Sequence, residues 1–254
     1  MASYLVTGSS RGVGLAIVTA LASKPASDVA KVFAAARSET ESLKHLVAIS
    51  NGRVVFLQLD VTLEESIKKA ADRVSEMQDG KGIDVLINNA GIMDPRTKSI
   101  ELMTNDHLDQ IFKVNVGGVH SVTRKFLPEL RKGSQKKIVN ISSTLGSISM
   151  ASASAPFGVP SYKISKAALN MLTVNYAMDL ANEDFTVIAI NPGWIRTDLG
   201  ASAADLSPEE GAEATLNVVF RVNSEETGKF FTVRVPGWEN KSGHQRYDGN
   251  CPPW

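Results

Sequence analysis

The chain has 254 residues, of which 43 % are hydrophobic and 21 % are charged, and its formal net charge is zero. This length and composition predict a globular protein with enough apolar material for a large core. The sequence has no charge excess and no stripe of Lys and Arg, which argues against a protein that binds nucleic acid.

The sequence predicts no intramolecular disulfide, no metal site and no membrane span. Cys251 is the one cysteine of the sequence, so no intramolecular disulfide can form. The four histidines are far apart along the chain and predict no metal site. The N-terminal sequence has no basic segment with an apolar stretch, and no apolar run is long enough to span a bilayer. We therefore expect a cytoplasmic protein with no metal and no membrane partner.

Seven short apolar runs, rich in β-branched residues, are separated by longer amphipathic stretches. The runs show little alternation of polar and apolar residues, which is typical of parallel strands buried on both faces. We predict strands at 3–8, 31–36, 53–59, 83–88, 136–142, 185–191 and 229–235. We predict helices at about 12–24, 38–49, 63–79, 104–131, 161–182 and 208–222.

This alternation predicts an α/β fold, a single domain over residues 1–254 with an open parallel sheet and helices on both faces. The stretch at 147–160 is rich in small residues and ends in prolines, so we expect a long loop there. In such sheets, ligands bind beyond the carboxyl ends of the strands, which makes the residues after each strand the most informative.

The first predicted strand ends in the sequence TGSSRGVG, residues 7–14, ahead of a predicted helix. Glycines at 8, 12 and 14 would let a pyrophosphate approach the free N–H groups at the start of that helix. A turn that needs glycine only for its backbone geometry is the alternative. The position between a strand and a helix favours a dinucleotide site.

The end of the second predicted strand favours NADP(H) over NAD(H). Sites for NAD usually carry an acidic residue here to bind the ribose hydroxyls, whereas this chain has Ala36 followed by Arg37. Arg37 can pair with the 2′-phosphate of NADP, and Arg11 in the glycine turn is a second candidate phosphate partner. Solvated surface arginines are the alternative at both positions.

Seven motifs along the chain resemble, in their order, those of the short-chain dehydrogenase/reductase family. They are TGSSRGVG (7–14), LDV (59–61), NNAG (88–91), VNVGG (114–118), IVNISS (138–143), YKISK (162–166) and NPGWIRT (191–197). The resemblance implies a doubly wound sheet of Rossmann type. The tail at 229–254 is similar to the sniffer-like and C-factor-like carbonyl reductases, a branch that includes fungal enzymes similar to norsolorinic acid ketoreductase.

Tyr162 stands four residues before Lys166, so on a helix the two side chains share one face. A packed tyrosine with a lysine that reaches solvent is the alternative. The resemblance implies that Tyr162 is the general acid and base, and that Lys166 lowers the pKa of the phenol and binds the nicotinamide ribose. It also implies that Ser143 orients the substrate carbonyl. Asn115, in a helix weakened by neighbouring glycines, would support a proton relay through a bound water.

The resemblance also implies a set of residues that bind the cofactor. These are Gly8, Ser10, Arg11, Gly12, Val13, Gly14, Arg37, Asp60, Val61, Asn88, Ala90, Gly91, Tyr162, Lys166, Pro192, Gly193, Ile195 and Thr197. For Asn88 and its neighbour Asn89, hydrogen bonds that merely hold the strand ends together are a strong alternative.

Eighteen residues separate Ser143 from Tyr162, which is several more than is usual in the family. The excess falls in the 147–160 loop. We expect this loop to help shape a pocket for a bulky or aromatic ketone, and a surface flap without ligand contacts is the alternative. The pocket residues we expect are Met93, Met150, Phe157, Val159, Trp194 and Leu199.

The sequence therefore favours an NADPH-dependent ketoreductase that interconverts a ketone and a secondary alcohol. An epimerase or dehydratase of the same fold, and a regulatory protein that binds NADP without turnover, are the alternatives. The predicted helix at 161–182 is apolar almost all round, so it needs a second partner besides the sheet. We expect a homodimer through the helices at 104–131 and 161–182, unless the C-terminal tail covers that face.

Overall fold

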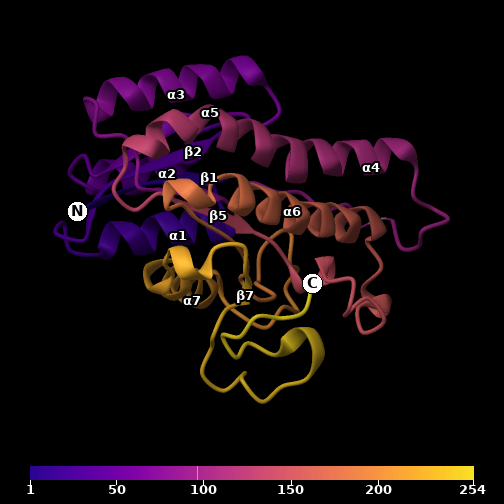
Figure 1. Ribbon diagram of the computed structural model, residues 1–254. Coiled ribbons are helices and arrows are strands. Elements are labelled where there is room, and N and C mark those ends of the chain that lie inside the picture. The colour runs from indigo at the N-terminus through magenta and orange to yellow at the C-terminus, as the bar shows by residue number, and fades with distance from the viewer. Residues whose placement is uncertain (96) are drawn as a thin grey trace.

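The computed structural model describes residues 1–95 and 97–254, and its centre is a parallel sheet of seven strands (Figure 1). The strands are β1 Ala2–Thr7, β2 Val29–Ala36, β3 Val54–Gln58, β4 Val85–Asn88, β5 Lys137–Ile141, β6 Thr186–Asn191 and β7 Phe230–Thr232. Their order across the sheet is β3-β2-β1-β4-β5-β6-β7, so the direction of winding changes between β1 and β4. The predicted α/β fold and all seven predicted strands are confirmed.

Helices cover both faces of the sheet. The α-helices are α1 Gly12–Ser23, α2 Glu41–Ile49, α3 Glu64–Gln78, α4 Asn105–Phe112, α5 Val119–Lys132, α6 Pro160–Asp179 and α7 Pro208–Arg221. Successive residues of a strand point to opposite faces, and β1 shows the result. Tyr4 and Val6 pack with α1, α2 and α7, whereas Leu5 packs with α3, α5 and the end of α6.

The predicted helix at 104–131 is interrupted by a π-helical segment. α4 runs into the segment η1, Lys113–Gly118, which leads into α5. Gly118 allows η1 to approach the end of β3, because a Cβ there would lie 2.8 Å from Cγ2 of Val61. Asn115 is at the centre of η1 and is fully buried. The irregular helix expected around Asn115 is therefore confirmed, and such π-helical turns are frequent at functional sites.

Short 3-10 turns complete the chain: η2 Thr144–Gly146, η3 Ala155–Phe157, η4 Ala181–Glu183, η5 Ser224–Glu226 and η6 Gly243–Gln245. The 147–160 stretch is a loop, as predicted, with η3 as its one helical turn among the described residues. The chain returns to this loop at its C-terminus, where Ser147 Oγ donates to the Pro253 carbonyl at 2.6 Å. No helix within the described residues is long and apolar enough to cross a bilayer.

Candidate active site

Tyr162 and Lys166 lie one turn apart in the first half of α6, on the face turned to β5. Tyr162 is 8 % exposed and Lys166 is 5 % exposed. The Lys166 Nζ atom lies 5.5 Å from the centre of the Tyr162 ring, and it donates a hydrogen bond to the Ile141 carbonyl at 2.7 Å. The predicted pairing of the two side chains on one helix face is confirmed, and the amine is anchored to the end of β5.

Ser143 brings a hydroxyl to the same place from the end of β5. Its Oγ accepts a hydrogen bond from the Leu145 N–H at 3.2 Å and is also a hydrogen-bond partner of the Tyr162 phenol. The preceding Ser142 points the other way, as predicted for neighbouring residues of a strand, and donates to Asn170 Oδ1 at 2.6 Å. Ser142 therefore ties β5 to α6, whereas Ser143 faces the Tyr162 phenol.

Burial controls the ionisation of both candidate catalytic groups. It raises the pKa of Tyr162 to about 12, because the phenolate would lose its hydration, and the hydrogen bond from Ser143 acts weakly in the opposite direction. Burial also lowers the pKa of Lys166 to about 8. The expectation of a lowered phenol pKa is therefore wrong for the net shift. Desolvation outweighs the hydrogen bond from Ser143, and at neutral pH the phenol keeps its proton.

Asn115 joins three elements behind this pair. Its amide nitrogen donates to the Ile92 carbonyl at 2.9 Å, and its amide oxygen accepts from the Ile92 N–H at the same distance. The amide nitrogen also donates to Ser165 Oγ on α6 at 3.0 Å. Gly91 lies between, since a Cβ at that position would be 3.4 Å from Asn115 Oδ1 and 3.8 Å from Lys166 Nζ. The end of β4, η1 and α6 therefore meet at the lysine.

The glycine turn after β1 packs closely on the end of β4. Gly8 has a φ of 68°, and a Cβ there would lie 2.8 Å from the Ala90 Cα, so only glycine fits. A Cβ at Gly14 would collide with the Gly8 carbonyl oxygen. Thr197 is carried over the same turn, because its methyl group would lie 3.3 Å from a Cβ at Gly12. The turn is thus a backbone cradle at the start of α1.

The two candidate phosphate-binding arginines differ in their partners. Arg11 Nη1 pairs with Asp198 Oδ2 at 2.7 Å, and both side chains are exposed. Arg37 is exposed and has no ion pair among the described residues, and its charge helps to lower the pKa of Asp60. Burial alone would raise that pKa, but hydrogen bonds from Thr62 and the charge of Arg37 outweigh it. Arg37 is therefore the better placed to meet a further anion.

The comparison with known families agrees with this geometry. Residues 3–207 match the short chain dehydrogenase family. The chain belongs to this family.

Relatives of this short-chain dehydrogenase include oxidoreductases. An uncharacterised oxidoreductase of Saccharomyces cerevisiae is 31 % identical over 245 residues, which cover 90 % of this chain and 94 % of that protein. The NADPH-bound carbonyl reductase from chicken fatty liver is 32 % identical with a TM-score of 0.86, and the match covers 100 % of this chain and 99 % of that chain. The carbonyl reductase Sniffer of Drosophila melanogaster is 26 % identical with a TM-score of 0.85, and the match covers both chains completely. The predicted resemblance to sniffer-like carbonyl reductases is confirmed.

At several positions of this dehydrogenase that are expected to contact the cofactor, the side chain holds the fold together. The amide nitrogen of Asn88 donates to Thr123 Oγ1 and to Asn140 Oδ1, so both its hydrogens are engaged within the core. Ile195 is 4 % exposed, and its side chain packs against Gly211 of α7. The alternative that Asn88 holds strand ends together is therefore favoured. Sequence spacing alone does not reveal on which side of the chain such a side chain lies.

Other matched positions of this dehydrogenase likewise serve the fold. Val61 packs on Gly118, Val13 in the first turn of α1 packs on the core, and the Ser10 carbonyl accepts a hydrogen bond from Thr40 at 2.7 Å. Gly193 has a φ of 89°, and a Cβ there would lie 2.6 Å from Leu206, so the turn after Pro192 is tight. At these positions it is the backbone that is left to face a ligand.

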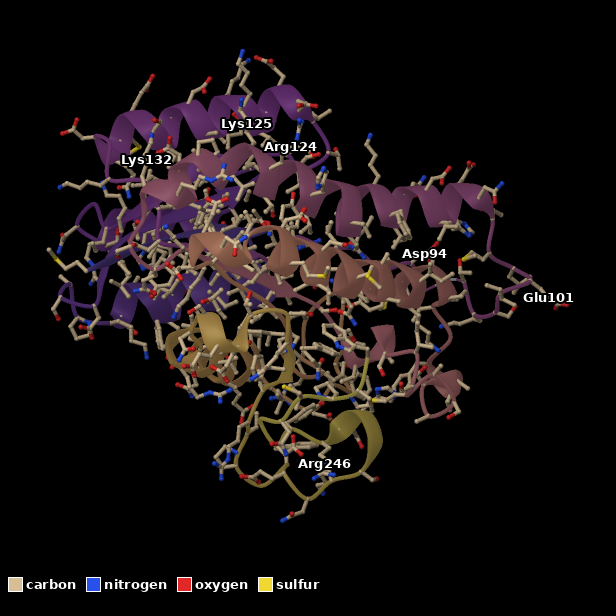
Figure 2. The ribbon with its side chains drawn as sticks, viewed as in Figure 1. Asp94, Glu101, Arg124, Lys125, Lys132 and Arg246 are labelled. Carbon is tan, nitrogen blue, oxygen red and sulfur yellow. The ribbon has the colours of Figure 1, made fainter. Side chains whose placement is uncertain are left out.

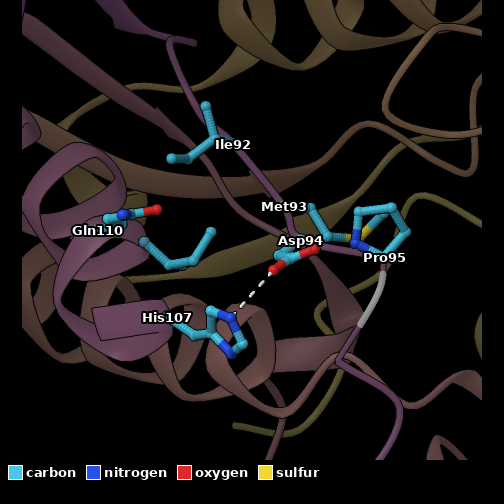
Figure 3. Close-up of a pocket in the computed structure, with 7 residues that line it drawn as sticks. Ile92, Met93, Asp94, Pro95, His107 and Gln110 are labelled. Atoms are coloured by element: carbon cyan, nitrogen blue, oxygen red, sulfur yellow. Dashed lines mark ion pairs between the residues drawn. The ribbon is translucent and has the colours of Figure 1, made fainter. Parts of the chain in front are cut away.

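The expected substrate residues divide between two places. Phe157 and Trp194 meet edge to face, with ring centres 6.2 Å apart. Met93 lines a separate cavity of about 310 Å³ together with Ile92, Asp94, Pro95, His107, Gln110 and Ile111 (Figure 3). In that cavity His107 Nε2 lies 3.8 Å from Asp94 Oδ2 (Figure 3). Figure 2 shows Asp94 beside α4 and Arg246 in the C-terminal tail, well apart on the two sides of α6.

The other residues expected to line the pocket differ in their exposure. Leu199 is exposed, whereas Val159 is buried at the start of α6, where its N–H donates to the Thr97 carbonyl at 3.1 Å. Phe157 also meets the ring of His244, with ring centres 5.7 Å apart. The sequence predicted no site role for His244. No local pattern could have identified it, because the tail reaches the loop only through the tertiary fold.

Proposed function

We propose that this protein is an NADPH-dependent carbonyl reductase that transfers a hydride between NADP(H) and a ketone or secondary alcohol. The observation that carries the proposal is the buried group of Tyr162, Lys166 and Ser143 beside the glycine turn. The likeness to an NADPH-bound carbonyl reductase over the full length of both chains supports it.

The residues around the turn fit a dinucleotide. Gly8 and Gly14 keep side chains out of the space at the start of α1, where backbone N–H groups are free to bind phosphate. Gly91 leaves room beside the Lys166 amine, which can donate to ribose hydroxyls. Arg37 at the end of β2 supplies a charge for a 2′-phosphate. When bound, the cofactor supplies the hydride.

The chain's own side chains would handle the proton. Tyr162, protonated at neutral pH, donates its phenolic hydrogen to the carbonyl oxygen of the ketone and takes it back in the reverse reaction. Ser143, already bonded to the phenol, would hold the same oxygen. Lys166 places a positive charge close to the phenolate as it forms. Asn115 keeps Ile92 and α6 in register, and it would support the relay that returns a proton to the lysine.

The direct test follows the loss of NADPH absorbance, and separately of NADH absorbance, with ketones from diacetyl to polycyclic quinones. We expect turnover with NADPH and a preference for bulky or aromatic ketones. Binding of NADPH, seen as thermal protection, without turnover of any ketone would contradict the reductase and favour a cofactor-binding regulator.

Arg37→Asp should shift the preference of the enzyme towards NADH. The substitution removes the cation that would meet the 2′-phosphate and places a carboxylate at the end of β2, where it repels phosphate and can accept from ribose hydroxyls. We expect the ratio of kcat/KM for NADPH to that for NADH to fall by about tenfold to hundredfold. Arg73→Asp, an exposed arginine on α3, is the matched control. An unchanged ratio in the Arg37 variant would refute this assignment.

We propose further that two copies pair through α4, α5 and α6. Ile164, Met171 and Met178 follow one another at intervals of seven on one face of α6, and they are 37 %, 62 % and 69 % exposed. Beside this face is an apolar groove of about 550 Å³, lined by Leu108, Asp109, Phe112, Lys113, Val116, Gly117, His120 and Leu172. The tail leaves these methionines exposed, which favours a second copy over the tail as the partner of this face.

Met171→Asp should therefore convert a dimer into a monomer. A carboxylate at the centre of a symmetric apolar interface would be buried without a partner, and it would face its own copy. Sedimentation velocity at several concentrations measures the change, with Met77→Asp on α3 as the matched control, since Met77 is also partly exposed. A wild-type protein that sediments as a monomer at every concentration would refute the dimer.

A further inference from the structure

The C-terminal tail folds back on the segment that follows β6. Arg234 and Asp248 form an antiparallel bridge, and the Val235 N–H donates to the Tyr247 carbonyl at 3.0 Å. The buried Tyr247 hydroxyl donates to Asp205 Oδ2 at 2.5 Å and accepts from the Trp194 N–H at 3.1 Å. The tail is thus a closed turn whose position relative to Trp194 is fixed by hydrogen bonds.

His244 is carried by this turn to the 147–160 loop. It lies in η6, Gly243–Gln245, and its ring meets the Phe157 ring edge to face with centres 5.7 Å apart. The Phe157 ring meets Trp194 in the same way at 6.2 Å. Three rings from three separate segments therefore form one aromatic wall: Phe157, Trp194 and His244.

Both ring nitrogens of His244 are buried, and the Met150 carbonyl is the one hydrogen-bond partner near the ring among the described residues, so one nitrogen is left without a partner. Burial, together with the charge of Lys163, lowers the pKa of the imidazole, although the nearby Met150 carbonyl raises it to a smaller extent. The ring is therefore neutral at neutral pH and offers one donor and one acceptor. A buried polar atom without a partner is costly, so a ligand that supplies one is favoured.

The aromatic wall is tied to the candidate catalytic residues by short stretches of chain. Phe157 precedes Tyr162 by five residues, across the turn that starts α6. Trp194 follows the end of β6, and the Ser142 N–H donates to the Ile190 carbonyl of that strand at 2.7 Å, one residue before Ser143. The loops that leave β5 and β6 thus carry the wall and the catalytic serine from adjacent strand ends.

We propose that His244 is a specificity-determining residue of the substrate site. Its imidazole hydrogen-bonds a hydroxyl group on an aromatic ketone, at the end remote from the reacting carbonyl, while Phe157 and Trp194 contact the aromatic rings. The inference rests on the proposed reductase function and names its substrate class, which is hydroxylated aromatic ketones.

Two matched ketones test the inference: 2-acetylnaphthalene and 6-hydroxy-2-acetylnaphthalene. We expect the wild-type enzyme to prefer the hydroxylated ketone in kcat/KM by about tenfold, the size of effect that one buried hydrogen bond produces. His244→Phe keeps a ring against Phe157 but removes both nitrogens, so the preference should fall to near one. His244→Asn, which restores a donor and an acceptor, should recover part of the preference.

The controls separate this inference from the proposed function. His45→Phe makes the same change on the exposed side of α2 and should leave the preference intact. Equal values for the two ketones in the wild type, or a preference that survives in His244→Phe, would overturn the role of His244. Turnover of other ketones, but of neither naphthalene probe, would also overturn the role of His244 and would leave the reductase function standing. Absence of turnover with every ketone would overturn the reductase function, and this inference with it.

Discussion

Tyr162→Phe should abolish ketone reduction, with kcat lower by at least about a thousandfold. The substitution removes one oxygen and leaves the ring in place, so the carbonyl oxygen loses its proton donor. The phenol is the one group within this buried cluster that is protonated, uncharged and bonded to Ser143. Lys166 lies one turn further along α6, with its amine anchored to the Ile141 carbonyl.

Two measurements establish that this loss is chemical. Thermal protection by NADPH should be retained in Tyr162→Phe, because the glycine turn and Arg37 are untouched. The melting temperature should change by only a few degrees, since the lost hydroxyl has one partner and Ser143 keeps its bond from the Leu145 N–H. A variant that retains more than about a tenth of wild-type kcat would show that another group donates the proton.

The fold could be predicted from the sequence because its main signals are local. Runs such as 83–88 lack alternation since both faces of the sheet are covered, and that property is visible without any knowledge of neighbours. Asn115 in its π-helical turn could be anticipated from the glycines at 117 and 118. The approach of Tyr162, Lys166 and Ser143 follows from the rule that strand ends meet at one edge of a parallel sheet.

What the sequence could not supply depends on the third dimension. The net pKa of Tyr162 is set by how completely the ring is buried, and spacing along a helix does not report burial. Ile195 belongs to the NPGWIRT motif, but its side chain turns into the core against α7. His244 reaches Phe157 across a separation of 87 residues, through the bond between Tyr247 and Asp205. Long-range contacts of this kind leave no periodic pattern to find.

Lys166→Met should inactivate the enzyme and stabilise the fold at the same time. The ammonium that favours the phenolate is lost, and we expect kcat to fall by about a hundredfold or more. Burial lowers the pKa of Lys166 from 10.5 to about 8, which corresponds to roughly 3 kcal/mol of unfavourable desolvation at neutral pH. The Ile141 carbonyl loses its partner in the variant at a cost of about 1 kcal/mol. A net gain of about 2 kcal/mol remains, because methionine fills a similar volume without a charge.

The gain in stability of Lys166→Met should depend on pH, and the lowered pKa of Lys166 determines the direction. Between pH 8 and 10.5 the unfolded lysine binds a proton that the folded lysine has released, so the wild-type free energy of unfolding rises with pH in this window. The difference between Lys166→Met and wild type is therefore largest at pH 7 and smaller by more than half at pH 9.5. Tyr162, with its raised pKa, contributes stability that is lost between about pH 10 and 12 in both proteins.

Denaturant unfolding at pH 7 and at pH 9.5 measures both effects, and Lys125→Met, an exposed lysine on α5 (Figure 2), controls for the loss of a charge. Lys125→Met should leave stability within about 0.5 kcal/mol of wild type at either pH. If Lys166→Met is destabilised at pH 7, the amine is better solvated than its burial indicates. In that case Lys166 would cost the fold less stability than its burial implies.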